Sequence, residues 1–342
     1  MVGRDMERTA TPAEGVVAIG ASAGGIEALC ELAAGMPADF PFAVMIVIHM
    51  GRGAPSLLAQ IIGRCGPLPA VAAVDGAVLE AGRIYAAVPD HHLLARDHRV
   101  ALSDGPWESG RRPGIDALFR SVALDYGPRA IGVLMSGLLD DGVAGLRAIK
   151  AKGGVTVVQE PADALFPDLP NNAIKAAAAD HTATAKEVGN LLAQLADRNI
   201  EEQPADPDGR LELENQIAMD SQFAAVVGME DLGPPTGYTC PSCNGALMAV
   251  ADNGYRCQVG HAWTAQALLV AYGDELEEAI WAAIRTLKDT ARLSHTLAEN
   301  AESAVDLEGY TDTANRAAHA IAALRQGLLA AKADNNGTTE TS

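Results

Sequence analysis

The sequence contains few aromatic residues and no long apolar run. Aromatic side chains make up 4% of the 342 residues, while 34 are glycine, a composition that favours tightly packed α/β layers over an aromatic-rich β-sandwich. No apolar stretch is long enough to cross a bilayer, and residues 1–8 lack the apolar segment of a secretory signal peptide. We therefore expect a cytoplasmic protein without membrane insertion.

Basic residues are also scarce. The formal net charge is −19, and it is unevenly distributed: residues 1–198 hold 17 Lys and Arg against 22 Asp and Glu, and residues 199–342 hold 8 against 22. An acidic surface repels phosphate backbones and anionic lipid. We therefore expect no nucleic-acid partner, and we interpret the acidic second half as a solvated helical surface.

Strand-like and helix-like patterns alternate through residues 15–198. Short apolar, β-branched runs occur at 16–19, 42–48, 130–135 and 155–158, and segments with helical spacing lie between and after them. This alternation predicts an α/β fold, a doubly wound and mostly parallel sheet with helices on both faces. The rest of the chain is expected to form a linker (199–235, with a short helix near 211–219), a Cys/His module (236–264), a helical hairpin that reverses near Gly309 (265–333) and a disordered tail (334–342).

Reactive side chains follow three of the predicted strands. Ser22 follows the first strand, His49 the second, and Asp140 and Asp141 lie just past the 130–135 strand. The carboxyl ends of parallel strands meet at one edge of the sheet, so we expect these groups to lie together. A serine hydroxyl needs a base to take its proton, and a neutral imidazole needs a carboxylate to fix its tautomer. The pattern therefore predicts Ser22, His49 and Asp141 as a catalytic triad.

Two other interpretations of the first turn were weighed. A Gly-rich turn between strand and helix also opens dinucleotide-binding folds, but Ser22 replaces the second glycine of that motif, and the second strand ends in His49 rather than in an acidic residue. A purely structural interpretation makes Ser22 a helix N-cap and His49 a buried histidine. Against both, residues 20–24 fit G-x-S-x-G, whose glycines allow the sharp turn that exposes a nucleophilic serine.

Residues 16–195 resemble the catalytic domain of the chemotaxis protein-glutamate methylesterases (CheB). The segments that carry the resemblance are Ile19–Gly25, Val47–Met50, Arg112–Phe119, Gly132–Gly142 and Leu169–Ile174. It implies hydrolysis of glutamate γ-methyl esters on the cytoplasmic domain of a methylated chemoreceptor, with release of methanol, and deamidation of certain glutamines. It places the nucleophile at Ser22, the base at His49 and the orienting carboxylate at Asp141, and it implies no cofactor for catalysis.

The resemblance also suggests supporting residues. Backbone N–H groups at Ala23 and Leu138 are expected to bind the oxyanion, and Arg112 to position the substrate, although a structural ion pair would explain Arg112 as well. Ala23 stands where the family usually has threonine, and Asp140 where it has asparagine, so that a second carboxylate lies beside the triad. That carboxylate is expected to raise the pKa of either aspartate or of His49.

The regulation of such an enzyme is open at this stage. Many family members begin with a phosphorylated receiver domain, and we expect none here, so that control would come from the C-terminal half, either by covering the Ser22 cleft or by recruiting a receptor or another signalling partner. The competing hypothesis is a scaffold without activity that keeps the fold and binds a chemotaxis or two-component partner. His91, His92 and His98 are expected to be solvated in a loop.

The cysteines fall into two groups. Cys30 and Cys65 stand alone in helical patterns and are expected to be small buried apolar residues. Cys240, Cys243, Cys257 and His261 form two pairs with thirteen residues between them, and a four-ligand Cys/His set of this kind favours a structural zinc ion in a ribbon. The alternative is a ribbon that folds with free thiols.

Overall fold

The structure is a computed structural model. It describes residues 12–51, 53, 56–200, 208–220, 232–250 and 254–337, with side chains up to residue 329 in the last helix. The chain divides into two compact units, residues 1–268 and 269–342, and each is described by itself. In the described part of the chain, no helix combines the length and the apolarity that a bilayer span requires.

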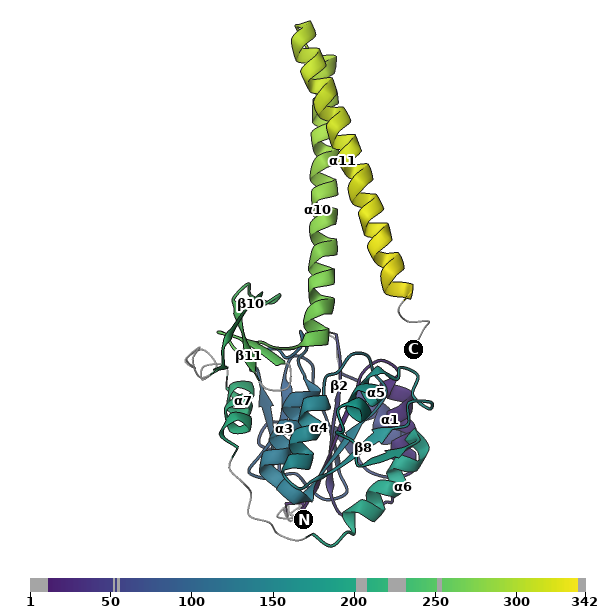
Figure 1. The fold of residues 1–342 in the computed structure, drawn as a ribbon. Coiled ribbons are helices and arrows are strands. Elements are labelled where there is room, and N and C mark those ends of the chain that lie inside the picture. Colours follow the sequence, from purple (N-terminus) through teal and green to yellow (C-terminus); the bar gives the residue numbers. More distant parts are fainter. Residues whose placement is uncertain are drawn as a thin grey trace, which may run out of the picture. The chain divides into compact units, whose positions relative to one another are not determined.

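A seven-stranded parallel sheet forms the centre of the first unit (Figure 1). Its strand order is β3-β4-β2-β1-β7-β8-β9, and every neighbouring pair is parallel. The strands are β1 (Val16–Ala21), β2 (Ala43–Ile48), β3 (Ala70–Ala72), β4 (Ile84–Ala86), β7 (Ala130–Leu134), β8 (Val155–Gln159) and β9 (His181–Ala183). The predicted doubly wound α/β class is confirmed. The chain leaves β1 toward β2 on one side and returns to β7 on the other, which makes the β1 end a topological switch point.

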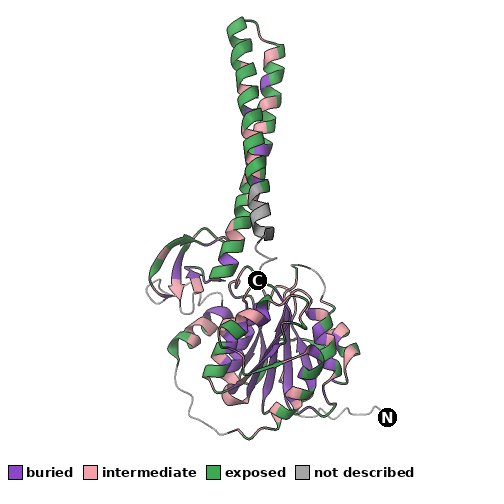
Figure 2. Ribbon diagram, turned by 45° about the vertical axis from the view of Figure 1, so that its right-hand side comes forward, coloured by how far each residue is buried: buried purple, intermediate pink, exposed green. Residues whose placement is uncertain are grey.

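Helices cover both faces of this sheet because alternate side chains of each strand point to opposite sides. In β1, Val17 and Ile19 pack into one core and Val16 and Ala18 into the other, all of them fully buried (Figure 2). The first core includes α1 (Gly25–Ala34), α2 (Leu58–Cys65) and α6 (Ala185–Ala196); the second includes α3 (Ile115–Tyr126), α4 (Val143–Ala151) and α5 (Asp168–Lys175). A β-hairpin of β5 (His92–Arg96) and β6 (Arg99–Ser103) packs beside α3.

A second, four-stranded antiparallel sheet belongs to the same unit. Its strands are β10 (Pro235–Thr239), β11 (Ala246–Val250), β12 (Gly254–Cys257) and β13 (Ala262–Thr264), and we refer to residues 235–264 as the ribbon. Helix α7 (Gly209–Met219) connects the ribbon to the first part of the unit. Its Ala218 packs with Leu94 of β5 and Ala117 of α3, and its Ile217 packs with Met248 of the ribbon.

Two long helices make up most of the rest. Helix α10 (Ala265–Glu299) begins directly after β13, and α11 (Ala304–Gly337) follows it. The chain reverses at residues 300–303, so the expected reversal near Gly309 was wrong: Gly309 lies inside α11, where a glycine is tolerated at a cost of about 1 kcal/mol. The tail expected to be disordered at 334–342 is helical as far as Gly337, so that part of the prediction was wrong. Residues 338–342 lie outside the described part of the chain.

The two isolated cysteines are joined. Cys30 of α1 and Cys65 at the end of α2 form a disulfide, with their Cα atoms 5.1 Å apart. The expectation of two independent buried thiols was therefore wrong. The two cysteines are 35 residues apart in the sequence, so the sequence pattern does not indicate that they are close in space. They are close because α1 and α2 cover the same face of the sheet.

Candidate active site and metal site

Ser22 lies in the turn between β1 and α1, at the switch point of the sheet. Its backbone N–H donates to the carbonyl of Ser136 (2.9 Å), which follows β7, and its own carbonyl accepts from Gly25 (3.0 Å). Gly137 must be glycine, because an added Cβ would lie 2.7 Å from the Ser22 Cβ. The end of β7 therefore packs directly against the turn that presents the serine hydroxyl.

The three predicted triad residues lie in one chain of hydrogen bonds. The Ser22 Oγ is 3.1 Å from His49 Nδ1, and His49 Nε2 is 2.7 Å from Asp141 Oδ2. Because Asp141 is ionised, Nε2 carries the imidazole hydrogen and Nδ1 is left to accept from the serine. His49 and Asp141 are 10% and 5% exposed at their side chains, which keeps water from competing for these bonds.

Asp141 is held by the backbone as well as by His49. The N–H group of Ile115 donates to Oδ2 (2.9 Å) and that of Asp116 to Oδ1 (3.0 Å), both at the start of α3. Burial acts to raise the pKa of Asp141, but the hydrogen bond and charge of His49 and the two backbone donors outweigh it, so the pKa lies below the ordinary value. Asp141 is therefore a fixed carboxylate at neutral pH.

Asp116 is a buried carboxyl that the sequence analysis missed. Its Oδ1 accepts from the Gly145 N–H of α4, so it links the start of α3 to the helix that follows Asp141. Burial, and after it the charge of Asp141, raises the pKa of Asp116 well above the ordinary value. Two carboxyls at one helix start thus shift in opposite directions: the pKa of Asp141 is lowered, and that of Asp116 is raised.

Asp140 points away from the triad, toward the ribbon. Its Oδ1 accepts a hydrogen bond from the hydroxyl of Thr264 at 2.6 Å. Burial raises the pKa of Asp140, the Thr264 hydroxyl lowers it and the charge of Asp141 raises it, with a net upward shift. Of the two aspartates expected to affect each other, Asp140 is therefore the one with the raised pKa.

The expected oxyanion donors flank the serine. Ala23 follows it in the turn, and Leu138 follows Gly137; among the described residues, neither backbone N–H has a hydrogen-bond partner. Arg112 is engaged elsewhere. Its guanidinium donates to the backbone carbonyls of Asp104 (2.6 Å) and Gly105 (2.9 Å). This is a structural role, but it differs from the ion pair considered as the alternative, because among the described residues no carboxylate pairs with Arg112.

The three loop histidines differ from one another. His91 and His98 are exposed, as expected, but His92 is fully buried, so its predicted solvation was wrong. Its Nε2 donates to the Pro106 carbonyl (2.9 Å) and its Nδ1 accepts from the Gly114 N–H (3.1 Å). Burial lowers the pKa of His92. A buried strand position occupied by a polar residue gives no hydropathy signal that would have shown this.

The four predicted metal ligands converge in the ribbon. Their Sγ and Nδ1 or Nε2 atoms all lie within 4.8 Å of one another, with Cys257 Sγ 3.5 Å from His261 Nδ1 and 3.6 Å from Cys243 Sγ. A tetrahedral zinc ion with bonds of about 2.0–2.3 Å separates its ligand atoms by about 3.5–3.8 Å. The donor set and its spacing therefore fit such an ion. Trp263 covers the cluster and donates its indole N–H to Cys240 Sγ at 3.4 Å.

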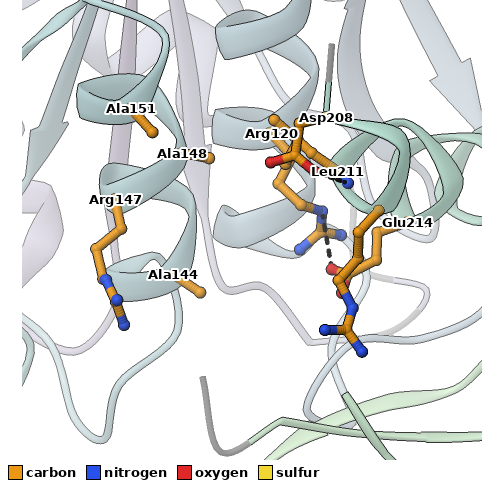
Figure 3. A pocket seen from close by; sticks show the side chains of 9 residues that line it. Arg120, Ala144, Arg147, Ala148, Ala151, Asp208, Leu211 and Glu214 are labelled. Atoms are coloured by element: carbon orange, nitrogen blue, oxygen red, sulfur yellow. Dashed lines mark hydrogen bonds and ion pairs between the residues drawn. The ribbon is translucent and has the colours of Figure 1, made fainter. Parts of the chain in front are cut away.

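A buried ion-pair network joins the ribbon to α3, to α7 and to the segment before α3. Glu108 pairs with Arg120 of α3 and with Arg256 of the ribbon (3.7 Å), and Glu214 of α7 pairs with both arginines (Figure 3 shows the Arg120–Glu214 pair). Burial acts to raise the pKa of Glu108, but the two arginines outweigh it and the pKa lies below the ordinary value. Beside this network, Arg120 and Glu214 line a pocket of about 290 Å³ between α4 and α7, and no triad residue lines it.

Comparison with known proteins gives one consistent result. A family model described as CheB methylesterase matches residues 17–192. A Geobacter metallireducens protein named protein-glutamate methylesterase/protein-glutamine glutaminase 4 is 36% identical over 182 residues, which cover 53% of this chain and 52% of that protein. A Leptospira interrogans protein is 32% identical over 187 residues, which cover 54% of this chain and 97% of that protein.

A solved structure agrees with the sequence comparisons. The CheB methylesterase catalytic domain of Thermotoga maritima matches with a TM-score of 0.51 and 27% identity, covering 53% of this chain and 98% of that one. The chain spans about half the length of several curated relatives that it matches. The family model alone matches half of the chain. This chain belongs to the CheB methylesterase family.

Proposed function

We propose that this chain is a protein-glutamate methylesterase that hydrolyses glutamate γ-methyl esters and also deamidates glutamine side chains. The observation that carries the proposal is the unbroken hydrogen-bond chain from Ser22 through His49 to Asp141 at the carboxyl edge of the sheet. Relatives in the family carry names for both activities. A scaffold that only binds a partner would not need a serine, a histidine and an aspartate aligned by hydrogen bonds.

The geometry supports a two-step acyl transfer. Ser22 Oγ attacks the ester carbonyl carbon while its proton passes to His49 Nδ1, and Asp141 stabilises the imidazolium through Nε2. The oxyanion would accept hydrogen bonds from the N–H groups of Ala23 and Leu138. The tetrahedral species then expels methanol, which takes its proton from His49. Water attacks the acyl-enzyme with His49 again as the base, and glutamate is released; a glutamine substrate would release ammonia in the first step.

The substrate we propose is the methylated cytoplasmic domain of a chemoreceptor, in the cytoplasm. Two apolar side chains beside the nucleophile turn suit a protein substrate: Leu138 is 46% exposed, and Leu165, which adjoins Gly24, is 70% exposed. These side chains would offer apolar surface for a protein substrate to cover when it binds. No cofactor is needed for the steps above. The ribbon and the helices after it would contact a signalling partner.

We further propose a structural zinc ion held by Cys240, Cys243, Cys257 and His261. Bound there, the ion would supply folding free energy by joining the two turns of the ribbon. All four protein ligands are present, which is typical of structural sites; catalytic sites keep an open position. The ligand set therefore supports a role in the fold of the ribbon.

The test is methanol release from a methylated receptor. The full chain should release methanol, and its Ser22→Ala variant should release none while still binding the receptor in a pull-down. The variant is the matched control because it removes only the nucleophile. Receptor binding by both proteins without methanol release by either would favour the scaffold hypothesis and overturn the proposed activity.

A further inference from the structure

We propose that the ribbon is part of the active site's support, and that Thr264 is a positioning residue for the esterase reaction that acts through Asp140. The inference rests on the proposed function. It concerns the hydroxyl of Thr264, which lies 124 residues along the chain from Asp140 and 2.6 Å from its carboxylate. Three observations lead to it.

The Thr264 hydroxyl makes two hydrogen bonds, one as donor and one as acceptor. It donates its hydrogen to Asp140 Oδ1, and it accepts the backbone N–H of Ala267 at 3.1 Å. The second bond is an N-cap, because α10 begins at Ala265. The helix start therefore orients the hydroxyl so that its only hydrogen points at Asp140.

The loop that Asp140 belongs to is the loop that carries Asp141. Leu139 has a positive φ of 65°, and Gly142 has a φ of 96° with its Cβ position blocked by Ile115, so the loop conformation is tightly constrained. A neighbouring helix, α5, also holds this loop. Asn172 donates to the Leu139 carbonyl at 2.7 Å and to the Gln266 side chain at 3.2 Å. Asp140 is thus held directly by Thr264. Leu139 is held by α5, and Asn172 links it indirectly to Gln266 at the start of α10.

Strand β13, which ends at Thr264, is itself bonded to the segment between β6 and α3. The Ala262 N–H donates to the Trp107 carbonyl (3.0 Å), and the Ala262 carbonyl accepts from Ser109 (2.7 Å). Arg256, on the neighbouring strand β12, is 1% exposed and pairs with Glu108. Removing one member of such a buried ion pair leaves an uncompensated charge, so the ribbon cannot separate from this surface without a large penalty.

These contacts predict what the loss of the hydroxyl would do. Asp140 is half-buried next to a second carboxylate, and without its donor it would have to turn to water or to another donor. Either movement shifts the residue that precedes Asp141. Because Asp141 orients His49, the effect should fall on kcat, with the KM for a small ester unchanged. A displacement of less than about 1 Å in such a group is enough for a measurable loss of rate.

The experiment compares threonine variants in the full chain. Thr264→Val keeps the shape and removes the hydroxyl, and we expect it to lower kcat on p-nitrophenyl acetate by about tenfold. Thr264→Ser should restore most of the rate. Thr236→Val is a matched control, because Thr236 also donates one hydrogen bond (to the Leu247 carbonyl, 2.7 Å) and accepts one (from Tyr238, 3.1 Å), both inside the ribbon. That variant should retain wild-type kcat.

A double-mutant cycle separates positioning from folding. Asp140→Ala removes the acceptor and leaves the ribbon untouched, so it should lose as much rate as Thr264→Val, and Thr264→Val should cost nothing more in its presence. Metal content and the thermal transition are measured for each variant. Full additivity, or a loss from Thr236→Val equal to that from Thr264→Val, would overturn the proposal. A wild type that does not hydrolyse the ester in a Ser22-dependent way would instead refute the proposed function.

Discussion

The seven-stranded sheet and the ribbon are stabilised by different interactions. In the sheet, strands such as β1 and β2 are buried at every residue, and the core on each face is apolar. In the ribbon, the fully buried residues include Arg256 and two cysteines beside only a few apolar side chains, such as Leu247. Apolar burial positions the strands that precede the three triad residues, whereas a buried ion pair and backbone hydrogen bonds contribute much of what holds the ribbon in place. This difference predicts which substitutions lower the catalytic rate directly and which weaken the structure around the active site.

The largest effect is expected from removing the nucleophile or its base. Ser22→Ala and His49→Ala should each lower kcat by about 10⁴-fold or more, and the double variant should be no worse than either, because the groups act as a unit. The measurement is the rate of methanol release per enzyme at saturating methylated receptor. Since neither side chain belongs to the apolar cores, both variants should melt like the wild type; an active Ser22→Ala would place the nucleophile elsewhere.

The two adjacent aspartates should differ sharply. Asp141→Asn would present a donor or a weaker acceptor to His49 and lose the preferred tautomer, with an expected loss of about 10³–10⁴-fold in kcat. Asp140→Asn keeps a carbonyl oxygen for the Thr264 hydroxyl and should cost less than about threefold. Steady-state kinetics on one ester decides it. If Asp140→Asn were the more damaging change, the assignment of the orienting carboxylate would be off by one residue.

Metal removal should damage the ribbon and leave the sheet folded. The full chain should copurify with about one zinc ion, and Cys240→Ser should lose it, because a three-ligand site binds far more weakly. Hydrogen exchange should then rise at β10 to β13, with protection in β1 and β7 unchanged. Metal retained by Cys240→Ser, or exchange rising equally in both sheets, would show that the two regions do not differ in this way.

A smaller effect concerns Asp116 and pH. The raised pKa means that the folded chain holds this proton at pH values where an unfolded carboxyl has released it. The folded state then binds more protons, so the contribution of Asp116 to stability falls as pH rises through the raised pKa. Asp116→Asn keeps the acceptor for Gly145 and removes the titration. Denaturant unfolding should show the free energy of unfolding of the variant rising relative to that of the wild type as pH rises; a constant difference would contradict a raised pKa for Asp116.

The sequence was most informative where structure follows hydropathy. Apolar runs that alternate with helical spacing predict the parallel sheet, and a parallel sheet brings the residues after β1, β2 and β7 to one edge. The Thr264–Asp140 bond and the burial of His92 could not be predicted in this way, because single polar side chains that pair across long sequence separations leave no periodic signal. The Cys30–Cys65 disulfide could not be predicted for a related reason. Which helices lie side by side on one face of a sheet is not known until the strand order is known.

The smallest effect on chemistry is expected from the helical hairpin. Within the second unit, Ile284, Ala314 and Ala317 form a buried stripe, while Leu276, Trp281 and Leu293 remain exposed on α10. A chain of residues 1–268 keeps the triad, Thr264 and its N-cap partner Ala267, so its kcat on a small soluble ester should lie within about twofold of the full chain. If the hairpin recruits the receptor, the shortened chain should be slower on methylated receptor alone, because it loses the local substrate concentration that a second contact provides. A shortened chain that is faster on the small ester would instead indicate that the hairpin restricts access to Ser22. Equal rates on both substrates would remove the hairpin from this reaction and leave the ribbon as the only C-terminal part that acts on the triad.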